Sequence, residues 1–193
     1  MKKKIILLSY LLIIVNNNLF ANNNAVAVTR TSQIKANAGE KFINKGIIDF
    51  IGDEGGVAMN GGTVINDGII QNTGAGGIFS EGKGSKGINK KTGKINNGDK
   101  QGMQSKKGGE IINEGTIHNT GPVGMYSHGI GSNAINRGII LTEGSYGMAA
   151  LEGGTLINEG TIRNNRDKGV EVDGVGSSFK NKGTVFNNGN KGV

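Results

Sequence analysis

Apolar and polar positions along the chain recur in one order, apolar-Asn-x-Gly-x-apolar, which appears seven times, two of them in a looser form (88–95 and 180–185). The copies are INKGII (43–48), INDGII (65–70), INKKTGKI (88–95), INEGTI (112–117), INRGII (135–140), INEGTI (157–162) and KNKGTV (180–185). The motif asparagines, separated by 22, 23, 24, 23, 22 and 23 residues, are Asn44, Asn66, Asn89, Asn113, Asn136, Asn158 and Asn181. A period this steady indicates an architecture built from stacked repeats.

Two columns of apolar residues keep the same period and predict short strands. Two residues after each motif glycine stands a β-branched residue: Ile48, Ile70, Ile95, Ile117, Ile140, Ile162 and Val185. We expect the second column to open with Gly56, Gly77, Gly102, Gly124, Gly147, Gly169 and Gly192. These glycines are followed in turn by Val57, Ile78, Met103, Met125, Met148, Val170 and Val193. Gly and Asn separate the runs, and no helical periodicity accompanies them.

A short strand with one or two inward side chains cannot bury them alone, but stacked copies about 4.8 Å apart form continuous apolar columns. A coil of about 23 residues suits three short strands and three turns. The sequence therefore predicts an all-β fold, a single-stranded right-handed parallel β-helix of about seven coils. In this fold Ile70, Ile117 and Ile162 lie in one internal file, and the methionines belong to the core.

Stacking also predicts what should happen at the corners. Asn and Gly are expected to supply left-handed backbone there. An amide ladder, each side chain bonded to the next, is expected at Asn72, Asn97, Asn119, Asn164 and Asn187. Charges of alternating sign should neighbour one another on an outer edge at Lys45, Asp67, Lys90, Glu114, Arg137, Glu159 and Lys182. The longest interval, 77–93, is expected to protrude as a loop.

The N-terminal residues are typical of a secretory signal peptide. Met1 to Lys4 is positively charged, and residues 5–15 form an apolar run of about eleven residues, too short for a spanning helix of ~20. Cleavage is expected after Ala21, with Ala27 as the alternative. We thus expect a signal-peptide helix at 1–21, a capping or linker segment at 22–41 and β-helix repeats at 42–193 that stop in mid-coil.

Composition narrows the classes of protein further. The chain has 193 residues, 36 of them Gly and none Cys, without a G-x-y triplet, which excludes collagen and a disulfide framework. The formal charge of +7 falls to +4 once Lys2, Lys3 and Lys4 are removed with the signal peptide. Few aromatic residues are present for base stacking, so nucleic acid is not an expected partner.

The repeats resemble the passenger regions of monomeric autotransporters of Gram-negative bacteria. The likeness lies in GGTVINDGII (61–70), GGEIINEGTI (108–117), GGTLINEGTI (153–162) and the GMYS and GMAA segments between 124 and 150. It implies display at the cell surface through a C-terminal translocator barrel in the outer membrane. No such barrel follows in this sequence, so we expect a fragment, a truncated gene product or a degenerate relative, periplasmic if the translocator is truly missing.

Residues suited to catalysis are scattered. The acid pairs Asp53/Glu54, Glu110/Glu114 and Glu171/Asp173 occupy different coil positions, and His118 and His128 lie on different predicted strands. Hydrolysis or lysis of a polysaccharide needs two or three convergent acids, with a base or calcium. The glycine-rich strings lack the helix and the Lys-Ser/Thr of a phosphate loop. We therefore expect no enzyme, no cofactor and no metal site.

One cluster of charge remains a candidate binding feature. Lysines concentrate in the third and fourth coils at Lys83, Lys86, Lys90, Lys91, Lys94, Lys106 and Lys107. They either contact anionic polymers or merely solvate the surface and block edge pairing. The expected function is that of an exported, otherwise monomeric adhesin passenger or stalk that touches host or bacterial glycans or proteins. The alternatives are a secreted polysaccharide-acting β-helix enzyme and a non-functional remnant of a longer gene.

Overall fold

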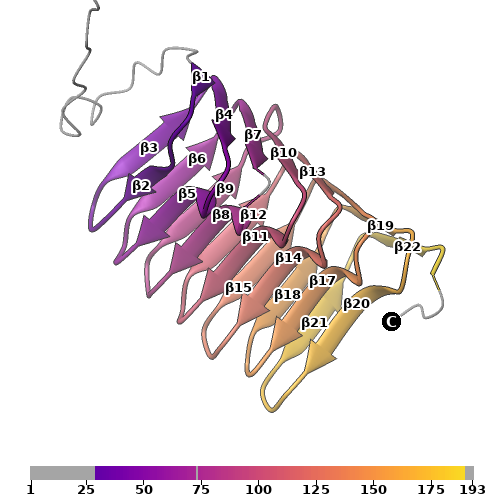
Figure 1. Cartoon of the computed structure of the whole chain (residues 1–193). Helices are drawn as coiled ribbons and strands as arrows, with labels where there is room; N and C mark the ends of the chain where they lie inside the picture. Colours follow the sequence, from indigo (N-terminus) through magenta and orange to yellow (C-terminus); the bar gives the residue numbers. More distant parts are fainter. Residues whose placement is uncertain (1–28, 73, 190–193) are drawn as a thin grey trace, which may run out of the picture.

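A computed structural model describes residues 29–72 and 74–189, and in these the chain winds as a parallel β-solenoid of about seven coils (Figure 1). Each coil contributes one strand to each of three parallel sheets. The described part of the chain contains no helix, and hence none that could cross a membrane. The predicted architecture and its coil number are confirmed; the predicted signal-peptide helix lies outside the described residues.

We name the sheets A, B and C. Sheet A comprises β1 (Thr29–Arg30), β4 (Ile47–Phe50), β7 (Ile69–Asn72), β10 (Lys94–Asn97), β13 (Thr116–Asn119), β16 (Ile139–Thr142), β19 (Thr161–Asn164) and β22 (Thr184–Asn187). Sheet B comprises β2 (Ile34–Ala36), β5 (Glu54–Met59), β8 (Gly76–Glu81), β11 (Gln101–Lys106), β14 (Val123–His128), β17 (Tyr146–Leu151) and β20 (Lys168–Asp173). Sheet C comprises β3 (Lys41–Asn44), β6 (Thr63–Asn66), β9 (Lys86–Asn89), β12 (Glu110–Asn113), β15 (Asn133–Asn136), β18 (Thr155–Asn158) and β21 (Ser178–Asn181).

The register places like residues on top of one another, as the period requires. Ile70, Ile95 and Ile117 are direct partners in sheet A, and the same file continues through Ile140 to Ile162. All five side chains are fully buried. The predicted internal file of isoleucines is therefore confirmed, and Met103, Met125 and Met148 of sheet B pair and are buried in the same way.

The second apolar column begins one residue earlier than the sequence suggested. Gly56 is the register partner of Ile78, so Gly55 stacks on Gly77 and restores the constant interval to the motif glycine. A Cβ atom on Gly56 would lie 2.8 Å from Val64 Cγ1, because Val64 of sheet C fills that part of the core. In the next coil the sizes are exchanged, since Gly87 lies opposite Ile78. The expectation of Gly56 and Val57 as the first pair was wrong for this reason.

A ladder of amides runs along the inside of the solenoid, but in a different column from the predicted one. Each motif asparagine donates from Nδ2 to Oδ1 of the motif asparagine in the next coil, at 2.8–2.9 Å. In the predicted column the side chains bond backbone carbonyls instead: Asn97 to Gln101 and Asn164 to Ser145. The predicted ladder was wrong because the turn after sheet A brings carbonyl groups, not amides, within reach.

Left-handed backbone is confined to the turns between sheets B and C. The non-glycine residues with positive φ are Asn60, Lys107 and Glu152 among the described residues. Ten glycines of these same turns also have positive φ, so the expectation that Gly and Asn supply left-handed backbone at the corners is confirmed at this corner of the coil. The motif asparagines and glycines, at another corner, are not among the residues with positive φ. The motif glycine is required by close stacking: a Cβ on Gly115 would lie 2.2 Å from the carbonyl oxygen of Gly93.

The turns from sheet B to sheet C alternate between two types along the solenoid. Four-residue turns occupy 37–40, 82–85, 129–132 and 174–177, and three-residue turns occupy 60–62, 107–109 and 152–154. Each three-residue turn is joined to the next four-residue turn by a serine hydroxyl: Ser132 Oγ accepts from the Gly108 amide at 3.1 Å and donates to the His128 carbonyl at 2.8 Å. Ser85 and Ser177 form the same pair of bonds. The true structural repeat is thus two coils.

The expected protruding loop at 77–93 is absent from the structure. Those residues form most of β8, a four-residue turn, all of β9 and the turn 90–93. That last turn has two residues more than the corresponding two-residue turns of the other coils. The variable spacing in the sequence therefore has two sources. One is the alternation of three-residue and four-residue turns between sheets B and C, and the other is the two extra residues of the turn 90–93.

We expect Ser132→Ala to lower the free energy of unfolding by about 1–2 kcal/mol, because the part-buried amide of Gly108 loses the fully buried Ser132 hydroxyl as its acceptor. Urea unfolding followed by circular dichroism measures the change. Ser178→Ala is the matched control, since that hydroxyl is exposed and makes one long contact of 3.3 Å to Thr155. Equal effects of the two substitutions would contradict the role given to Ser132.

Candidate functional site

The lysines of the third and fourth coils lie at the two edges of sheet C, not in one patch. Lys83 and Lys107 stand in the turns between sheets B and C, with Lys106 and Lys86 ending and beginning the neighbouring strands. Their sequence neighbours Lys90, Lys91 and Lys94 lie at the opposite edge: the first two in the turn 90–93, the third at the start of β10.

These lysines also differ in whether they form ion pairs. Lys107 Nζ lies 2.5 Å from Glu81 and Lys86 Nζ lies 3.0 Å from Glu110. Lys106 Nζ is 6.0 Å from the centre of the Phe79 ring, close enough for a cation–π contact. Within the described residues five of the seven lysines form no ion pair: Lys83, Lys90, Lys91, Lys94 and Lys106. The exposed positive charge is therefore concentrated at the turn 90–93.

The predicted alternation of charge along an outer edge is formed at its C-terminal half. Glu159 accepts from Arg137 and from Lys182, each at 2.9 Å, and Arg137 also lies 4.0 Å from Glu114. Hydrogen bonds from Lys182 and Arg137 hold the pKa of the Glu159 carboxyl below its usual value. In the N-terminal half the longer turn 90–93 changes the pattern of contacts. The hydroxyl of Thr92, in that turn, donates to Asp67. Exposed pairs of this kind favour the correct register more than they add stability.

The acid pairs do not converge. Glu110 and Glu171 are paired with lysines, and no group of three or more acidic or histidine side chains in the described residues could hold a metal ion. His128 lies 3.0 Å from Glu152 at the end of sheet B, whereas His118 lies on the outer face of sheet A. The two histidines are therefore on different faces, as the sequence indicated.

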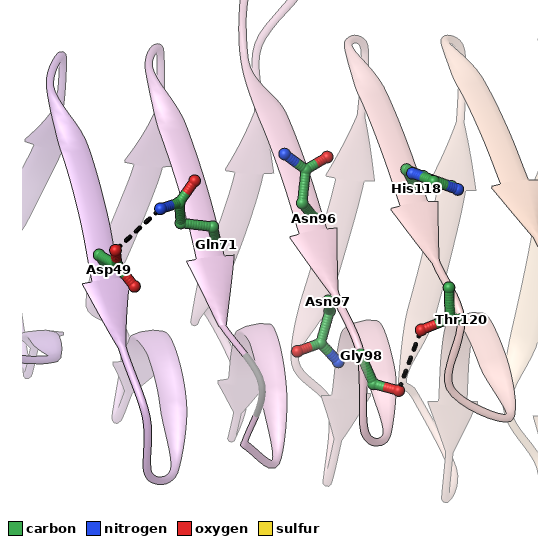
Figure 2. Close-up of a pocket in the computed structure, with 7 residues that line it drawn as sticks. All are labelled: Asp49, Gln71, Asn96, Asn97, Gly98, His118 and Thr120. Atoms are coloured by element: carbon green, nitrogen blue, oxygen red, sulfur yellow. Dashed lines mark hydrogen bonds between the residues drawn. The ribbon is translucent and has the colours of Figure 1, made fainter.

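A shallow recess of about 380 Å³ lies on the outer face of sheet A. One row of outward-facing side chains crosses the recess, with one residue from each of four successive coils. In order along the solenoid these are Asp49, Gln71, Asn96 and His118, each the register partner of the next. Figure 2 shows this row, in which Gln71 Nε2 donates to Asp49 Oδ2 at 2.8 Å. The edge of the recess is formed by the corner after sheet A: Asn97, Gly98 and Thr120.

Sequence reasoning missed this recess. None of its outward residues belongs to the repeated motif, and their column changes identity at each coil. The available signal was the polarity of the third residue of each sheet A strand, which is Asp, Gln, Asn and His before it becomes Leu141. Polar residues that alternate with buried isoleucines mark the solvent face of a strand, but the spacing alone does not tell a recess from a flat surface.

The comparisons with known proteins agree with the fold. The model of the BigA third pectate lyase-like domain matches residues 3–190 of the chain. Searches of curated proteins and of solved structures gave no match.

Proposed function

The chain belongs to the family of the BigA third pectate lyase-like domain, and from this premise we propose that it is a non-catalytic passenger segment of an exported adhesin. In this proposal the solenoid is a stiff spacer at the cell surface, and its exposed lysines contact anionic polymers of a host or bacterial surface. The autotransporter class and the surface location are parts of the proposal.

The observation that carries the proposal is the unbroken internal ladder of motif asparagines. Every one of them from Asn44 to Asn158 donates to its successor, so the coils are locked in one register along the solenoid. Aligned amides of this kind polarise one another and strengthen each bond. A rod held in register in this way suits a spacer or a display surface.

The chemistry of the outer faces also favours a binding role over catalysis. The acids that could serve a hydrolase or lyase are separated, and two of them are neutralised by lysines. General acid–base chemistry needs its groups within hydrogen-bond reach of one substrate. The alternative of a polysaccharide-acting enzyme draws support from the name of the family alone.

We expect the full chain in solution to bind a surface of immobilised heparin and to lose about tenfold in affinity when Lys83, Lys90 and Lys91 are changed to Gln. The reason is that these ammonium groups are exposed and have no carboxylate partner among the described residues. Surface plasmon resonance at low and at moderate salt measures the loss, which should shrink as salt screens the charges.

The matched control changes Lys35, Lys41 and Lys45 to Gln, which removes the same charge from the first coils. Equal losses in the two triple variants would show that net charge alone drives binding and would contradict the proposed contact. A second arm incubates the chain with polygalacturonate and calcium and follows the ultraviolet absorbance of unsaturated products. Their appearance would contradict the non-catalytic role.

A further inference from the structure

The recess on sheet A has the periodicity of a site for an extended polymer. Gln71, Asn96 and His118 project from neighbouring strands of one parallel sheet, so they form three rungs about 4.8 Å apart along the solenoid axis. That spacing is close to the length of one pyranose unit in an extended β-1,4-linked glycan. A glycan that runs along the axis would therefore present one sugar unit to each rung.

The corner beneath these rungs contains hydrogen-bond acceptors without donors. Further along the same column Thr142 Oγ1 accepts from the amide of Gly144, and Asn164 Oδ1 accepts from the amide of Arg166. Asn97 Oδ1 and Asn119 Oδ1, in contrast, are buried and accept no hydrogen bond among the described residues.

One of these two acceptors belongs to a residue that lines the recess, and the other lies just behind it. Asn97, which is only 3% exposed, lines it, and so do the residues that directly follow Asn97 and Asn119, Gly98 and Thr120. A buried carbonyl group without a donor destabilises the folded chain, because no hydrogen bond offsets its loss of hydration. Both oxygen atoms are covered in the free protein, so a ligand hydroxyl would gain this hydrogen bond at Asn97 by turning its side chain toward the recess.

The side chains of the recess match hydroxyl groups rather than charges. The amide of Asn96 and the imidazole of His118 each offer a donor and an acceptor, and neither side chain is hydrogen-bonded within the described residues (Figure 2). No lysine or arginine lines the recess, and Asp49, its one formal charge, already accepts from Gln71. An alcohol both donates and accepts, so it complements these groups without a compensating charge.

We propose that the recess between Asp49 and His118 binds an uncharged, extended oligosaccharide of about three sugar units, aligned with the solenoid axis. This site goes beyond the proposed contact of the lysines with anionic polymers, because it uses another face and another ligand chemistry. The recess volume lies in the range of small-molecule sites. Since no Phe, Tyr or Trp side chain lines it, the affinity is expected to be weak, with a Kd of about 1 mM.

The test is a titration of the full chain with cellotriose, followed by NMR of the side-chain amides of Gln71 and Asn96 and of the His118 imidazole. We expect these resonances to shift, and we expect the double variant Asn96→Ala/His118→Ala to weaken binding at least tenfold. Asn133→Ala, on the outer face of sheet C, is the matched control and should bind as the unaltered chain does.

Three comparisons decide the ligand class. Glucose should bind more weakly than cellotriose because it reaches one rung, and maltotriose should bind more weakly because its chain is curved. Equal or tighter binding of trigalacturonate, or unchanged binding in the double variant, would overturn the proposal. The double variant should retain its heparin binding, and the lysine variants their cellotriose binding, so the two proposals fail or succeed separately. Thermal unfolding of every variant checks that each is folded.

Discussion

Replacing Asn113 by alanine is expected to lower the free energy of unfolding by about 3–5 kcal/mol. Asn113 is fully buried at the centre of the ladder, where it accepts from Asn89 and donates to Asn136, both at 2.8 Å. It also donates to the carbonyl groups of Gly115 and Ile139 at 3.3 Å. The substitution removes all of these bonds and leaves a buried acceptor on Asn136 without its donor. Urea unfolding followed by circular dichroism measures the loss.

The same substitution at the end of the ladder provides the control. Asn181 is exposed, and its side chain accepts from Asn158 at 2.8 Å. We expect Asn181→Ala to cost about 1 kcal/mol or less, because water replaces the lost partner. If the two substitutions cost the same, the buried ladder is not what holds the coils in register.

Replacing Gly138 by alanine is expected to have a comparable or larger effect, a loss of about 4 kcal/mol or more in the free energy of unfolding. A Cβ atom there would lie 2.1 Å from the carbonyl oxygen of Gly115 and 2.7 Å from the carbonyl carbon of Glu114. Both neighbours are backbone atoms of the preceding coil, so they cannot rotate away. Two coils would have to separate, which breaks the hydrogen bonds of the sheet between them. The yield of folded protein and its melting temperature report the effect.

Gly108 provides the control that separates this steric clash from backbone strain, because it lies in an open turn. Gly108 has φ +84°, and the nearest atoms to an added Cβ lie 3.6 Å away. Gly108→Ala therefore tests the left-handed conformation alone, with an expected loss of about 1–2 kcal/mol. A result for Gly138→Ala no larger than this would show that the coils can move apart easily.

The period and the core could be predicted because they follow from one-dimensional spacing. Ile70 and Ile117 occupy equivalent positions in the sequence, and stacking turns that equivalence into one buried file. The outward direction of Ile112 does not follow from its hydrophobicity but from its neighbour. It precedes Asn113, and because side chains alternate along a strand, an inward asparagine forces its neighbouring isoleucine to face outward.

The position of the amide ladder could not be predicted from spacing, because two asparagine columns share the same period. What separates them is the backbone that follows each strand. After Asn113 the short turn brings the next coil's amide side chain into line, whereas Asn119 finds three backbone carbonyl groups, including those of Gly121 and Val123. Which acceptor lies within reach of each asparagine depends on the geometry of the turn, and residue spacing does not specify that geometry.

The recess and the alternation of turns were missed for different reasons. The row from Asp49 to His118 has no repeated letter, so a search for periodicity passes over it. The alternation, in contrast, is visible in the sequence once it is sought: Gly-x-Gly-Ser at 82–85, 129–132 and 174–177 takes turns with x-Gly-Gly at 60–62, 107–109 and 152–154. The two turn types differ by one residue only, so the single-coil period of the motif is the more conspicuous of the two.

The pairing of unlike turns through Ser85, Ser132 and Ser177 determines how the gene can change in length. Removing one coil would bring two turns of the same type together and leave one amide without its serine. Removing or duplicating two coils keeps every partner. We therefore expect the gene to tolerate unequal recombination in steps of 45 to 47 codons, the separations between equivalent serines. The unit that can be gained or lost in evolution is thus a pair of coils.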